Sequence, residues 1–381
     1  MAKLGEVCIQ ITDGSHNPPS GVEQSEYLML SSKNIDDDFI TLDSPRFLSH
    51  SDYIAENKRT TVSEGDLLMT IVGTIGRVAI VPEELKGICL QRSVAVIKPE
   101  REVVNNRYLM YQLQNMRPFL EKEARGVAQK GIYLKQVSQL DIKLPELEHQ
   151  MQIVKVLDKA SKLIFLRRQQ LAKLDELVKA RFVEMFGDPV KNTMDWEIKP
   201  LSELGELNRG VSKARPRNSP ELLGGPYPLI QTGEVANAKT YITSFNSTYS
   251  EKGLAQSKMW PKGTLCITIA ANIAQTSILT FDACFPDSVV GFISRNMTNE
   301  LFIHYWFSFF QKILDEQAPQ VAQKNINLKI LSELNVIVPP LSLQNRFAAF
   351  VERVDQQKQT VQQGLEKLEL MKKALMQEYF G

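Results

Sequence analysis

Two long stretches of the chain place apolar residues at alternating steps of three and four, which is the spacing of a helix that packs along one narrow seam. The first stretch covers residues 144–187 and the second covers residues 338–381. Charged residues interrupt the seam only at Arg167 in the first stretch and at Lys358 and Lys372 in the second. The seam residues are Ile153, Leu157, Ala160, Ile164, Leu171, Leu174 and Val178 in the first stretch, and Phe347, Val351, Val354, Val361, Leu365, Leu368, Leu375 and Tyr379 in the second. The pattern predicts one long helix in each stretch.

The two stretches are copies of one another. They align without a gap at a constant offset of 194 residues, which pairs Gln150 with Gln344. The match extends upstream, where VAQKGIYLKQVSQL (residues 127–140) aligns with VAQKNINLKILSEL (residues 321–334) at the same offset. Roughly twenty of about sixty aligned positions are identical, which indicates an internal duplication.

A helix with so narrow a seam buries little apolar surface unless a second helix lies against it. For a single helix, packing of the stripe on the core of its own domain would explain the pattern. Because there are two matched helices, each following its own globular stretch, an intramolecular antiparallel pair is the favoured interpretation. At about 1.5 Å per residue, some 40 residues give a rod of roughly 60 Å, long enough to act as a spacer.

The remaining sequence forms two globular stretches of mixed character. Glycine-marked pairs of strands are expected at residues 64–81 and 262–279, because turn residues divide each apolar run in two. The other expected elements are strands at 27–32 and 226–235, helices at 106–123 and 299–314, and a turn-rich loop at 11–19, where Asp-Gly and Asn-Pro-Pro disfavour regular structure. We therefore predict a mixed α/β (α+β) fold in four segments, with globular domains at 1–145 and 189–339 and long helices at 146–188 and 340–381.

Composition narrows the functional class only slightly. The chain of 381 residues is 43% hydrophobic and 23% charged. It has no apolar run of membrane-spanning length and no signal peptide at its start, so we expect a cytoplasmic protein with no membrane partner. Four cysteines and four histidines share no ligand spacing, which favours buried free thiols over a metal site or a disulfide framework.

The charge is balanced as a whole and in each part. The net charge is +1, with 17 basic and 19 acidic residues in 1–145 and 14 basic and 13 acidic residues in 189–339. A protein that binds nucleic acid by itself usually has a visibly basic element. If DNA is the ligand, the positive charge must gather on one face, or a partner must supply much of the phosphate contact.

The order of variable stretch, long helix, variable stretch and long helix resembles the specificity subunit of type I restriction-modification systems. The phrases that carry the resemblance are TDGSHNPP (12–19), EGDLLMTIVGTIGRVAIV (64–81), QKGIYLKQVSQLDIKLPELEHQMQIV (129–154) and FGDP (186–189), followed by a new domain that opens with Trp196. The resemblance covers essentially the whole chain. One segment departs from it: RGVSKARPRNSP (209–220) matches the early loop of the first half only weakly.

This resemblance implies that each globular domain is a target recognition domain that reads one half of a bipartite, asymmetric site in double-stranded DNA. The helices would hold the domains apart and dock two methyltransferase subunits, and restriction and translocation subunits would join through that complex. The chain itself would be non-catalytic and hold no cofactor, with S-adenosylmethionine, ATP and Mg²⁺ bound by the partners. An antiparallel helix pair would relate the domains by a pseudo-twofold axis, so that half-sites on opposite strands lie about one helical turn, ~34 Å, apart.

Residues that read DNA are expected among polar side chains on turns, because arginine can bind guanine bidentately and glutamine can bind adenine. The candidates are Lys58, Arg59, Thr74, Arg77, Gln91 and Arg92 in the first domain, and Lys213, Arg215, Arg217, Lys258 and Gln275 in the second. Tyr133 and Lys130 are further candidates. The pairs Gln129-Lys130 and Gln323-Lys324 occur in both halves, which favours phosphate contact or scaffold structure over base discrimination. For each candidate, a solvated or ion-paired surface side chain is the alternative.

Two rival functions are alternatives to DNA recognition. The segment Asn17-Pro18-Pro19-Ser20 is similar to the Asn/Asp-Pro-Pro-aromatic loop of adenine methyltransferases, but its fourth residue is serine and no glycine-rich strand-turn-helix precedes it. No Walker-type phosphate loop is present, so ATP hydrolysis is not expected. The second rival is a helical adaptor that binds proteins at both globular ends, which a near-neutral charge would suit; the family resemblance favours DNA recognition.

Overall fold

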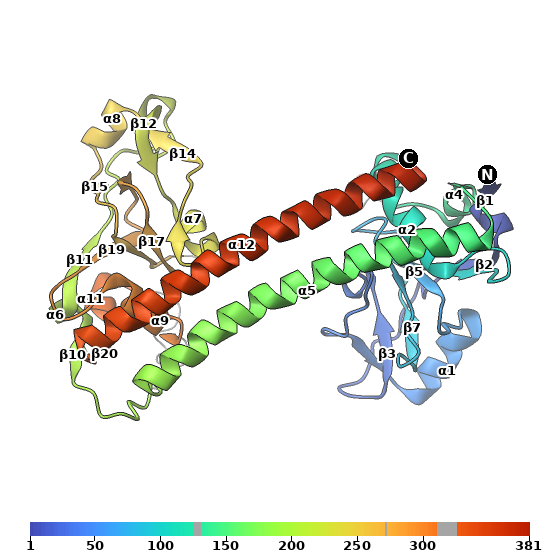
Figure 1. Cartoon of the computed structure of the whole chain (residues 1–381), viewed down its shortest axis with the longest axis horizontal. Helices are drawn as coiled ribbons and strands as arrows, with labels where there is room; N and C mark the ends of the chain where they lie inside the picture. The colour runs from blue at the N-terminus through green and yellow to red at the C-terminus, as the bar shows by residue number, and fades with distance from the viewer. Residues whose placement is uncertain (125–130, 271–272, 311–325) are drawn as a thin grey trace. The chain divides into compact units, whose positions relative to one another are not determined.

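A computed structural model describes residues 1–124, 131–270, 273–310 and 326–381 (Figure 1). Two helices of 40 residues each, α5 (Leu147–Phe186) and α12 (Leu341–Phe380), confirm the prediction of two long helices. Gly187 ends α5 with a φ of 75°, and its N–H donates to the Val183 carbonyl at 2.8 Å. This left-handed cap satisfies one of the free carbonyl groups at the end of a helix.

The chain divides into two compact units. The first unit comprises residues 1–168 and 363–381, and the second comprises residues 169–362. Each unit therefore holds one globular domain together with the start of one long helix and the end of the other.

Within each unit the two helix segments run antiparallel, as the seam pattern predicted. In the first unit the residue segment leading into α5 contacts the end of α12 and the middle of α5 contacts the later part of α12, and in the second unit the later part of α5 contacts the earlier part of α12. The contacts are Lys143 Nζ to the Gly381 carbonyl (2.6 Å) and Arg168 to Glu369 (2.6 Å) in the first unit, and Asp175 to Lys358 (2.7 Å) and the rings of Phe182 and Phe347 (5.4 Å) in the second. Every seam residue identified in the sequence is buried or half-buried.

The first globular domain packs two larger sheets, and a separate two-stranded sheet pairs β1 with β9. An antiparallel sheet has the order β2-β8-β5-β6, and a smaller sheet has the order β4-β3-β7, in which β3 and β7 are parallel. The strands of this domain are β1 (Ala2–Lys3), β2 (Cys8–Asp13), β3 (Tyr27–Leu30), β4 (Arg46–Leu48), β5 (Leu67–Thr70), β6 (Val78–Ile80), β7 (Ile88–Leu90), β8 (Val94–Pro99) and β9 (Asp141–Ile142). Its helices are α1 (His50–Arg59), α2 (Asn106–Asn115), α3 (Arg117–Glu123) and α4 (Leu134–Ser138).

The second globular domain repeats this plan and extends it. Its sheets have the orders β11-β19-β16-β17-β13 and β14-β12-β18-β15, so β13 and β15 are additions at the edges. The strands are β10 (Ile198–Pro200), β11 (Gly205–Arg209), β12 (Leu223–Leu229), β13 (Tyr241–Ile242), β14 (Ser247–Tyr249), β15 (Met259–Trp260), β16 (Leu265–Thr268), β17 (Thr276–Leu279), β18 (Ala283–Cys284), β19 (Val289–Ser294) and β20 (Asn335–Ile337). The helices are α6 (Leu201–Leu204), α7 (Thr232–Asn237), α8 (Glu251–Ala255), α9 (Glu300–Phe307) and α11 (Leu328–Ser332). The duplication seen in the helices therefore extends to the globular domains.

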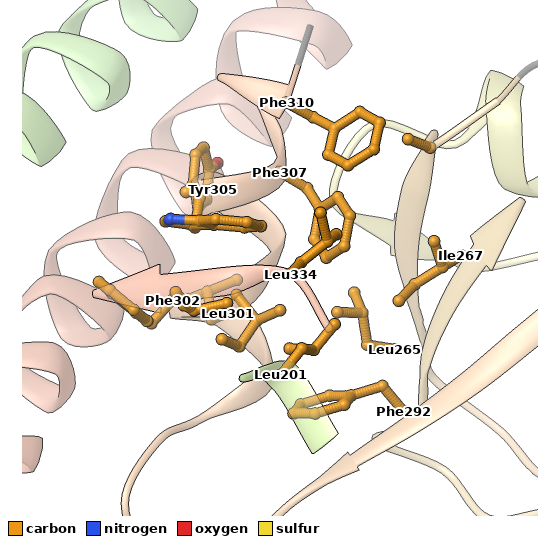
Figure 2. Close-up of a cluster of buried hydrophobic side chains, with 14 of the residues drawn as sticks. Leu201, Leu265, Ile267, Phe292, Leu301, Phe302, Tyr305, Phe307, Phe310 and Leu334 are labelled. Atoms are coloured by element: carbon orange, nitrogen blue, oxygen red, sulfur yellow. The ribbon is translucent and has the colours of Figure 1, made fainter. Parts of the chain in front are cut away.

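The core of the second unit lies between its larger sheet, α9 and the long helices. Figure 2 shows Phe302 and Phe307 of α9 in one cluster with Phe292 of the sheet, and all three side chains are buried. Phe182 of α5 and Phe347 of α12 complete the same cluster. Burying a side chain of this size stabilises by roughly 1.5–3 kcal/mol. Because residues of the sheet, α9 and both long helices share the cluster, the domain and its helix segments form one hydrophobic core.

A buried glutamine joins each domain to the helix that follows it. In the first unit Gln150 accepts a hydrogen bond from the Asn105 N–H (2.8 Å) and donates to the carbonyls of Pro145 (2.8 Å) and Val103 (3.3 Å). Asn105 in turn caps α2, since its side chain accepts from two backbone N–H groups at the start of that helix. The amide thus fixes α2 relative to the start of α5.

Gln344 makes the same joint in the second unit. It donates to the carbonyls of Pro339 (2.8 Å) and Met297 (3.0 Å) and accepts from Thr298 Oγ1 (2.9 Å) and the Asn299 N–H (3.3 Å). Asn299 caps α9. Both glutamines are fully buried. The backbone groups that they bind correspond at the offset of 194, and the Thr298 hydroxyl is an additional donor in the second unit, where the first unit has Val104.

Several elements differ from their predicted form. The helix expected at 106–123 is two helices, α2 and α3, separated at Met116, because Pro118 has no N–H to continue the hydrogen-bond ladder and its ring clashes with the preceding turn. The helix expected at 299–314 is α9, which ends at Phe307, and residues 311–314 lie outside the described residues.

The predicted boundaries of one loop and two strands were also wrong. Residues 11–13, assigned to a loop, continue strand β2, since Ile11 pairs with Ile97 and the turn begins only at Gly14. The strand expected at 27–32 ends at Leu30. The strand expected at 226–235 ends at Leu229 and is followed by helix α7, whose start is fixed by the Glu234 carboxylate that accepts from the Gln231 N–H (3.2 Å). The paired strands expected at 64–81 and 262–279 are present as β5–β6 and β16–β17.

Candidate nucleic-acid interface

Several connections meet at one end of the first domain. Because its main sheet is antiparallel, β2 and β5 end where β8 and β6 begin. The segments that leave this edge are residues 14–19, the turn 71–77 and the turn 91–93, and the end of α1 at residues 58–60 lies beside them. We call this set of segments the loop end of the first unit.

Backbone hydrogen bonds hold the loop end together. Ser15 donates its N–H to the Leu90 carbonyl (2.7 Å) and accepts from the Arg92 N–H (2.9 Å). Thr60, directly after α1, donates its hydroxyl to the Asp13 carbonyl (2.9 Å). Gly14 is required at this point, since a Cβ atom there would lie 2.1 Å from the Leu90 carbonyl oxygen. Three segments far apart in the sequence are thereby brought together.

The charged side chains of this region are largely paired. Asp13 lies 2.8 Å from His16 and 3.5 Å from Arg59, and Glu56 accepts from the Ser15 hydroxyl (3.0 Å). The Arg59 side chain is nevertheless 48% exposed. Its pairing with Asp13 holds the guanidinium at the loop end without burying it, so the group stays accessible to a ligand.

The other first-domain candidates lie in two turns and near the end of α1. Gln91 and Arg92 lie in the turn next to Ser15, and Arg92 is exposed and makes no ion pair with any residue that the structure describes. Thr74 is exposed in the turn 71–77, and Arg77 at its end lies 3.3 Å from Asp36. Lys58 is exposed near the end of α1.

Tyr133 lies beside the same turn. The N–H of Ile132 donates to the Ile71 carbonyl (2.9 Å), which places the next residue, with 70% of its surface exposed, close to residues 71–77. Lys130 and Lys324, with Gln129 and Gln323 beside them, lie outside the described residues.

The second domain has an equivalent loop end. Gly210 occupies the place of Gly14: its N–H donates to the Val289 carbonyl (2.8 Å), and a Cβ there would lie 2.2 Å from the Phe285 carbonyl oxygen. Ser257, just after α8, donates its hydroxyl to the Val211 carbonyl (2.7 Å), one residue after the glycine, whereas Thr60 binds the Asp13 carbonyl, one residue before it. The segment 209–220, which matches the first half weakly in sequence, therefore begins in the same way in the structure.

The second-domain candidates surround this loop. Arg217 pairs with Asp287 at 2.7 Å, and Arg215 donates to the carbonyls of Ser212 and Ala214 (both 2.8 Å). Lys213 and Gln275 are exposed. The Lys258 ammonium lies 3.9 Å from the centre of the Trp260 ring, a cation–π contact worth about 0.5–1 kcal/mol at an exposed site.

The structure thus brings Arg59, Gln91 and Arg92 together in the first domain, and Lys213, Arg217 and Lys258 in the second. His16 is part of the first group and was missed from the sequence, although it directly follows the required Gly14-Ser15 pair. Asp13, Asp36 and Asp287 were missed because each pairs with an arginine far away in the sequence. These carboxylates reduce the attraction of the loop ends for phosphate, which agrees with the balanced charge of each domain.

Several ionisable groups with shifted pKa values lie in the cores. Burial raises the pKa of Cys8 and Cys89 to about 12, so both stay protonated thiols near neutral pH. All four cysteines are free, and three of them are buried. Among the described residues there is no cluster of three or more His, Cys, Asp or Glu side chains arranged to hold a metal ion. Within the described ranges, no helix has both the length and the apolar character needed to cross a membrane.

Comparison with known proteins gives one consistent result. The model of the type I restriction modification DNA specificity domain matches twice, at residues 29–176 and 193–370. The chain therefore belongs to the family of type I restriction-modification specificity proteins, as its sequence pattern predicted. The two matches correspond to the two halves of the duplication.

Named relatives and solved structures agree. A protein of Methanocaldococcus jannaschii described as a type I restriction enzyme MjaX specificity subunit is 23% identical over 348 residues, covering 85% of this chain and 80% of that protein. The type I restriction enzyme EcoBI specificity subunit of Escherichia coli is 36% identical over 100 residues, covering 26% of this chain and 21% of that protein. The crystal structure of the type I restriction-modification S subunit from M. genitalium covers 100% of this chain and 95% of its own, with 13% identity and a TM-score of 0.56. A chain from a structure of the assembly and conformational transition of the type I R-M system gives 18% identity and a TM-score of 0.57, covering 100% and 96%.

Proposed function

We propose that this chain is the DNA-reading subunit of a type I restriction-modification complex, in which each globular domain reads one half of a bipartite, asymmetric DNA site. The observation that carries the proposal is the loop end, which recurs in both domains: a glycine packs against the neighbouring turn and a hydroxyl just after a helix binds a carbonyl beside that glycine, whereas the exposed side chains differ. A duplicated scaffold with two different surfaces suits a site whose two halves differ in sequence. A helical adaptor that binds proteins at both globular ends would not explain why polar side chains gather on both loop ends.

The roles of the candidate residues follow from their chemistry. Exposed lysines and arginines at a loop end can contact phosphates and set the register of a domain on the duplex. The bases are read by side chains that reach the major groove, where arginine and glutamine make bidentate pairs. We assign Lys58, Arg59 and Arg92 to phosphate or base contact in the first domain, and Lys213, Arg217 and Lys258 to the same task in the second.

The long helices would dock two methyltransferase subunits. The part of α5 in the first unit exposes Leu163, Phe165 and Leu166, and the part of α12 in the same unit exposes Leu370 and Met371. Adjacent exposed apolar side chains of this size indicate a surface that a partner covers. Restriction and translocation subunits would join through that complex, and S-adenosylmethionine, ATP and Mg²⁺ would bind to the partners. Because the ligand is cellular DNA, we place the assembly in the cytoplasm.

Mapping of methylated adenines tests the proposal. This chain is co-expressed with the methyltransferase subunit encoded beside it, and modified adenines in the host DNA are located by single-molecule sequencing. We expect a bipartite, asymmetric motif with one modified adenine in each half, absent from cells that lack this chain. A stable purified complex that leaves the DNA without such a motif would instead favour the adaptor. Methylation by this chain without its partner would contradict the non-catalytic role.

A further inference from the structure

One turn is built in the same way in both domains although its residues differ. In the first domain it leads from Thr70 at the end of β5 to Arg77, and in the second from Thr268 at the end of β16 to Gln275. Thr70 donates its N–H to the Arg77 carbonyl, and its hydroxyl accepts from the Arg77 N–H, at 2.9 and 3.0 Å. Thr268 makes both bonds to Gln275 at the same 2.9 and 3.0 Å.

The agreement extends through the rest of the turn that the structure describes. Gly76 donates to the Thr70 carbonyl and Ala274 donates to the Thr268 carbonyl, both at 2.8 Å. Both residues have positive φ values, 77° and 59°. The residue after each threonine donates to a serine carbonyl in the neighbouring turn, at 2.9 Å to Ser93 and at 3.1 Å to Ser288. Arg77 and Gln275 therefore occupy equivalent backbone positions.

The two threonines anchor these positions. Thr70 and Thr268 are fully buried, whereas Arg77 is half-buried and Gln275 is exposed. Each buried threonine hydroxyl accepts a hydrogen bond from the backbone N–H of Arg77 or Gln275. The bond therefore fixes the backbone position from which that residue's side chain leaves the domain. Preorganisation of this kind is what a base contact needs, because bidentate pairing tolerates little displacement.

The environment of Arg77 leaves its guanidinium available. Three consecutive aspartates, Asp36 to Asp38, lie near this turn, but Asp37 pairs with Arg117 and Asp38 with Lys372 (3.2 Å). Asp36 alone faces Arg77, at 3.3 Å from one terminal nitrogen. A guanidinium has five N–H donors, so most of them stay free for a ligand while the carboxylate restricts the side chain to few rotamers.

The second domain shows that this ion pair is not what holds the turn. Gln275 makes no side-chain hydrogen bond or ion pair within the described part of the chain, yet its turn has the same backbone bonds. The backbone of the turn therefore does not depend on whether the residue is arginine or glutamine. The two domains carry different residues at this position, as two different half-sites would require.

We propose that Arg77 and Gln275 are symmetry-related specificity residues that each read one base pair, at equivalent positions of the two half-sites. Arg77 would bind the O6 and N7 atoms of guanine, and Gln275 would bind the N6 and N7 atoms of adenine. This inference rests on the proposed function, because it assumes that the loop ends meet DNA.

Residue exchange between the domains tests the inference. Arg77→Gln and Gln275→Arg are expressed separately with the methyltransferase subunit, and the methylated motif of each is mapped in host DNA. For Arg77→Gln we expect guanine to be replaced by adenine at one position of the first half-site, with discrimination against the original base of about ten- to a hundred-fold. For Gln275→Arg we expect the opposite change at one position of the second half-site.

Lys86→Gln is the matched control, since Lys86 is exposed in the connection between β6 and β7, at the other end of the sheets. It should leave the motif unchanged. An Arg77→Gln motif identical to the wild type, a uniform loss of methylation with no change of sequence, or a change in both half-sites would overturn the inference. Absence of any motif for the wild-type chain would refute the proposed function itself, so the two failures are distinguishable.

Discussion

In the first unit Gln150 holds Asn105 at the start of α2, and in the second Gln344 holds Asn299 at the start of α9, through corresponding backbone groups. At the loop ends the correspondence is different. The bonds of Gly14 and Gly210 to the first residue of the neighbouring strand match. The ion pairs do not: Arg59 pairs with Asp13 in one domain, and Arg217 pairs with Asp287 in the other. The two units therefore share the glutamine joint, with its asparagine and proline partners, whereas their loop ends share the glycine contact but not the ion pairs.

The free-energy cost of a substitution explains why the joint is retained and the loop ends differ. A buried amide that satisfies several backbone groups cannot change without leaving some of them unpaired, at about 1–3 kcal/mol for each buried group. An exposed side chain on a turn costs within about 0.5 kcal/mol when it changes. Substitutions therefore accumulate where the surface is free to vary, which is also where a recognition site must vary.

Removal of the joint should have the largest effect. In Gln150→Leu the Asn105 N–H and the carbonyls of Pro145 and Val103 lose their partner within the first unit. We expect a loss of about 3–5 kcal/mol in the free energy of unfolding, from two or three unpaired buried groups. Hydrogen exchange followed by mass spectrometry should show faster exchange in α2 and the start of α5.

Gln152→Leu is the control, because Gln152 is exposed on the same helix two residues away. It should change the unfolding free energy by less than about 0.5 kcal/mol. Gln344→Leu should repeat the loss in α9 and the start of α12. A cost for Gln150→Leu no greater than that of Gln152→Leu would mean that the joint does not hold the domain.

The long helices and the duplication were predictable because both are visible as periodicity and offset along the chain. Strands β5, β6, β16 and β17 were also predictable, since turn residues divide each apolar run. The break at Met116 was predictable in principle from Pro118, whose missing N–H interrupts a helix wherever it lies. Helix α7 was hidden, since its start depends on one side-chain bond between Gln231 and Glu234.

The loop ends were predictable only in part. Turn positions and residue types pointed to Arg59, Arg92 and Arg217, but the sequence contains no sign of the aspartates that pair with two of them. Arg59 and Asp13 are 46 residues apart, and Arg217 and Asp287 are 70 apart, so only the tertiary fold brings them together. The equivalence of Gly14 and Gly210 was hidden because every residue around them has changed.

A second difference between the units is a partly buried histidine on α9. His304 of α9 lies where Met110 lies in α2, at the offset of 194, and its Nδ1 is 2.9 Å from Thr276 Oγ1. Burial and the nearby charge of Lys358 on α12 lower the pKa of His304 to about 4, from an ordinary value of 6.5. Lys358 is itself paired with Asp175 and Asp355.

This difference predicts an acid sensitivity that is absent from the first unit at the same place. Below pH 6.5 the unfolded chain binds a proton that the folded chain does not, so stability falls as the pH drops towards about 4. Between pH 7 and pH 5 the loss should be about 1–2 kcal/mol. Urea unfolding at both pH values should show a smaller loss for His304→Met, which copies the first unit. An equal loss in the variant and the wild type would assign the acid sensitivity to other groups.

The smallest expected effect concerns the helices. Gly364 lies in the middle of α12, where α5 carries Gln170 at the same offset. Apart from the adjacent backbone of α12, no heavy atom of the described residues lies within 4 Å of the position that a Cβ would take. A glycine inside a helix destabilises by about 0.5–1 kcal/mol relative to alanine, because it loses more backbone freedom on folding. Gly364→Ala should therefore raise the free energy of unfolding by that amount in urea titration. Gly76→Ala is the opposite case, since its φ of 77° and the Arg117 Cγ at 3.2 Å leave no room for a methyl group, and it should destabilise. If Gly364→Ala leaves stability unchanged, the helix at this point is strained in a way that α5 is not, and the two helices are less alike than their shared seam indicates.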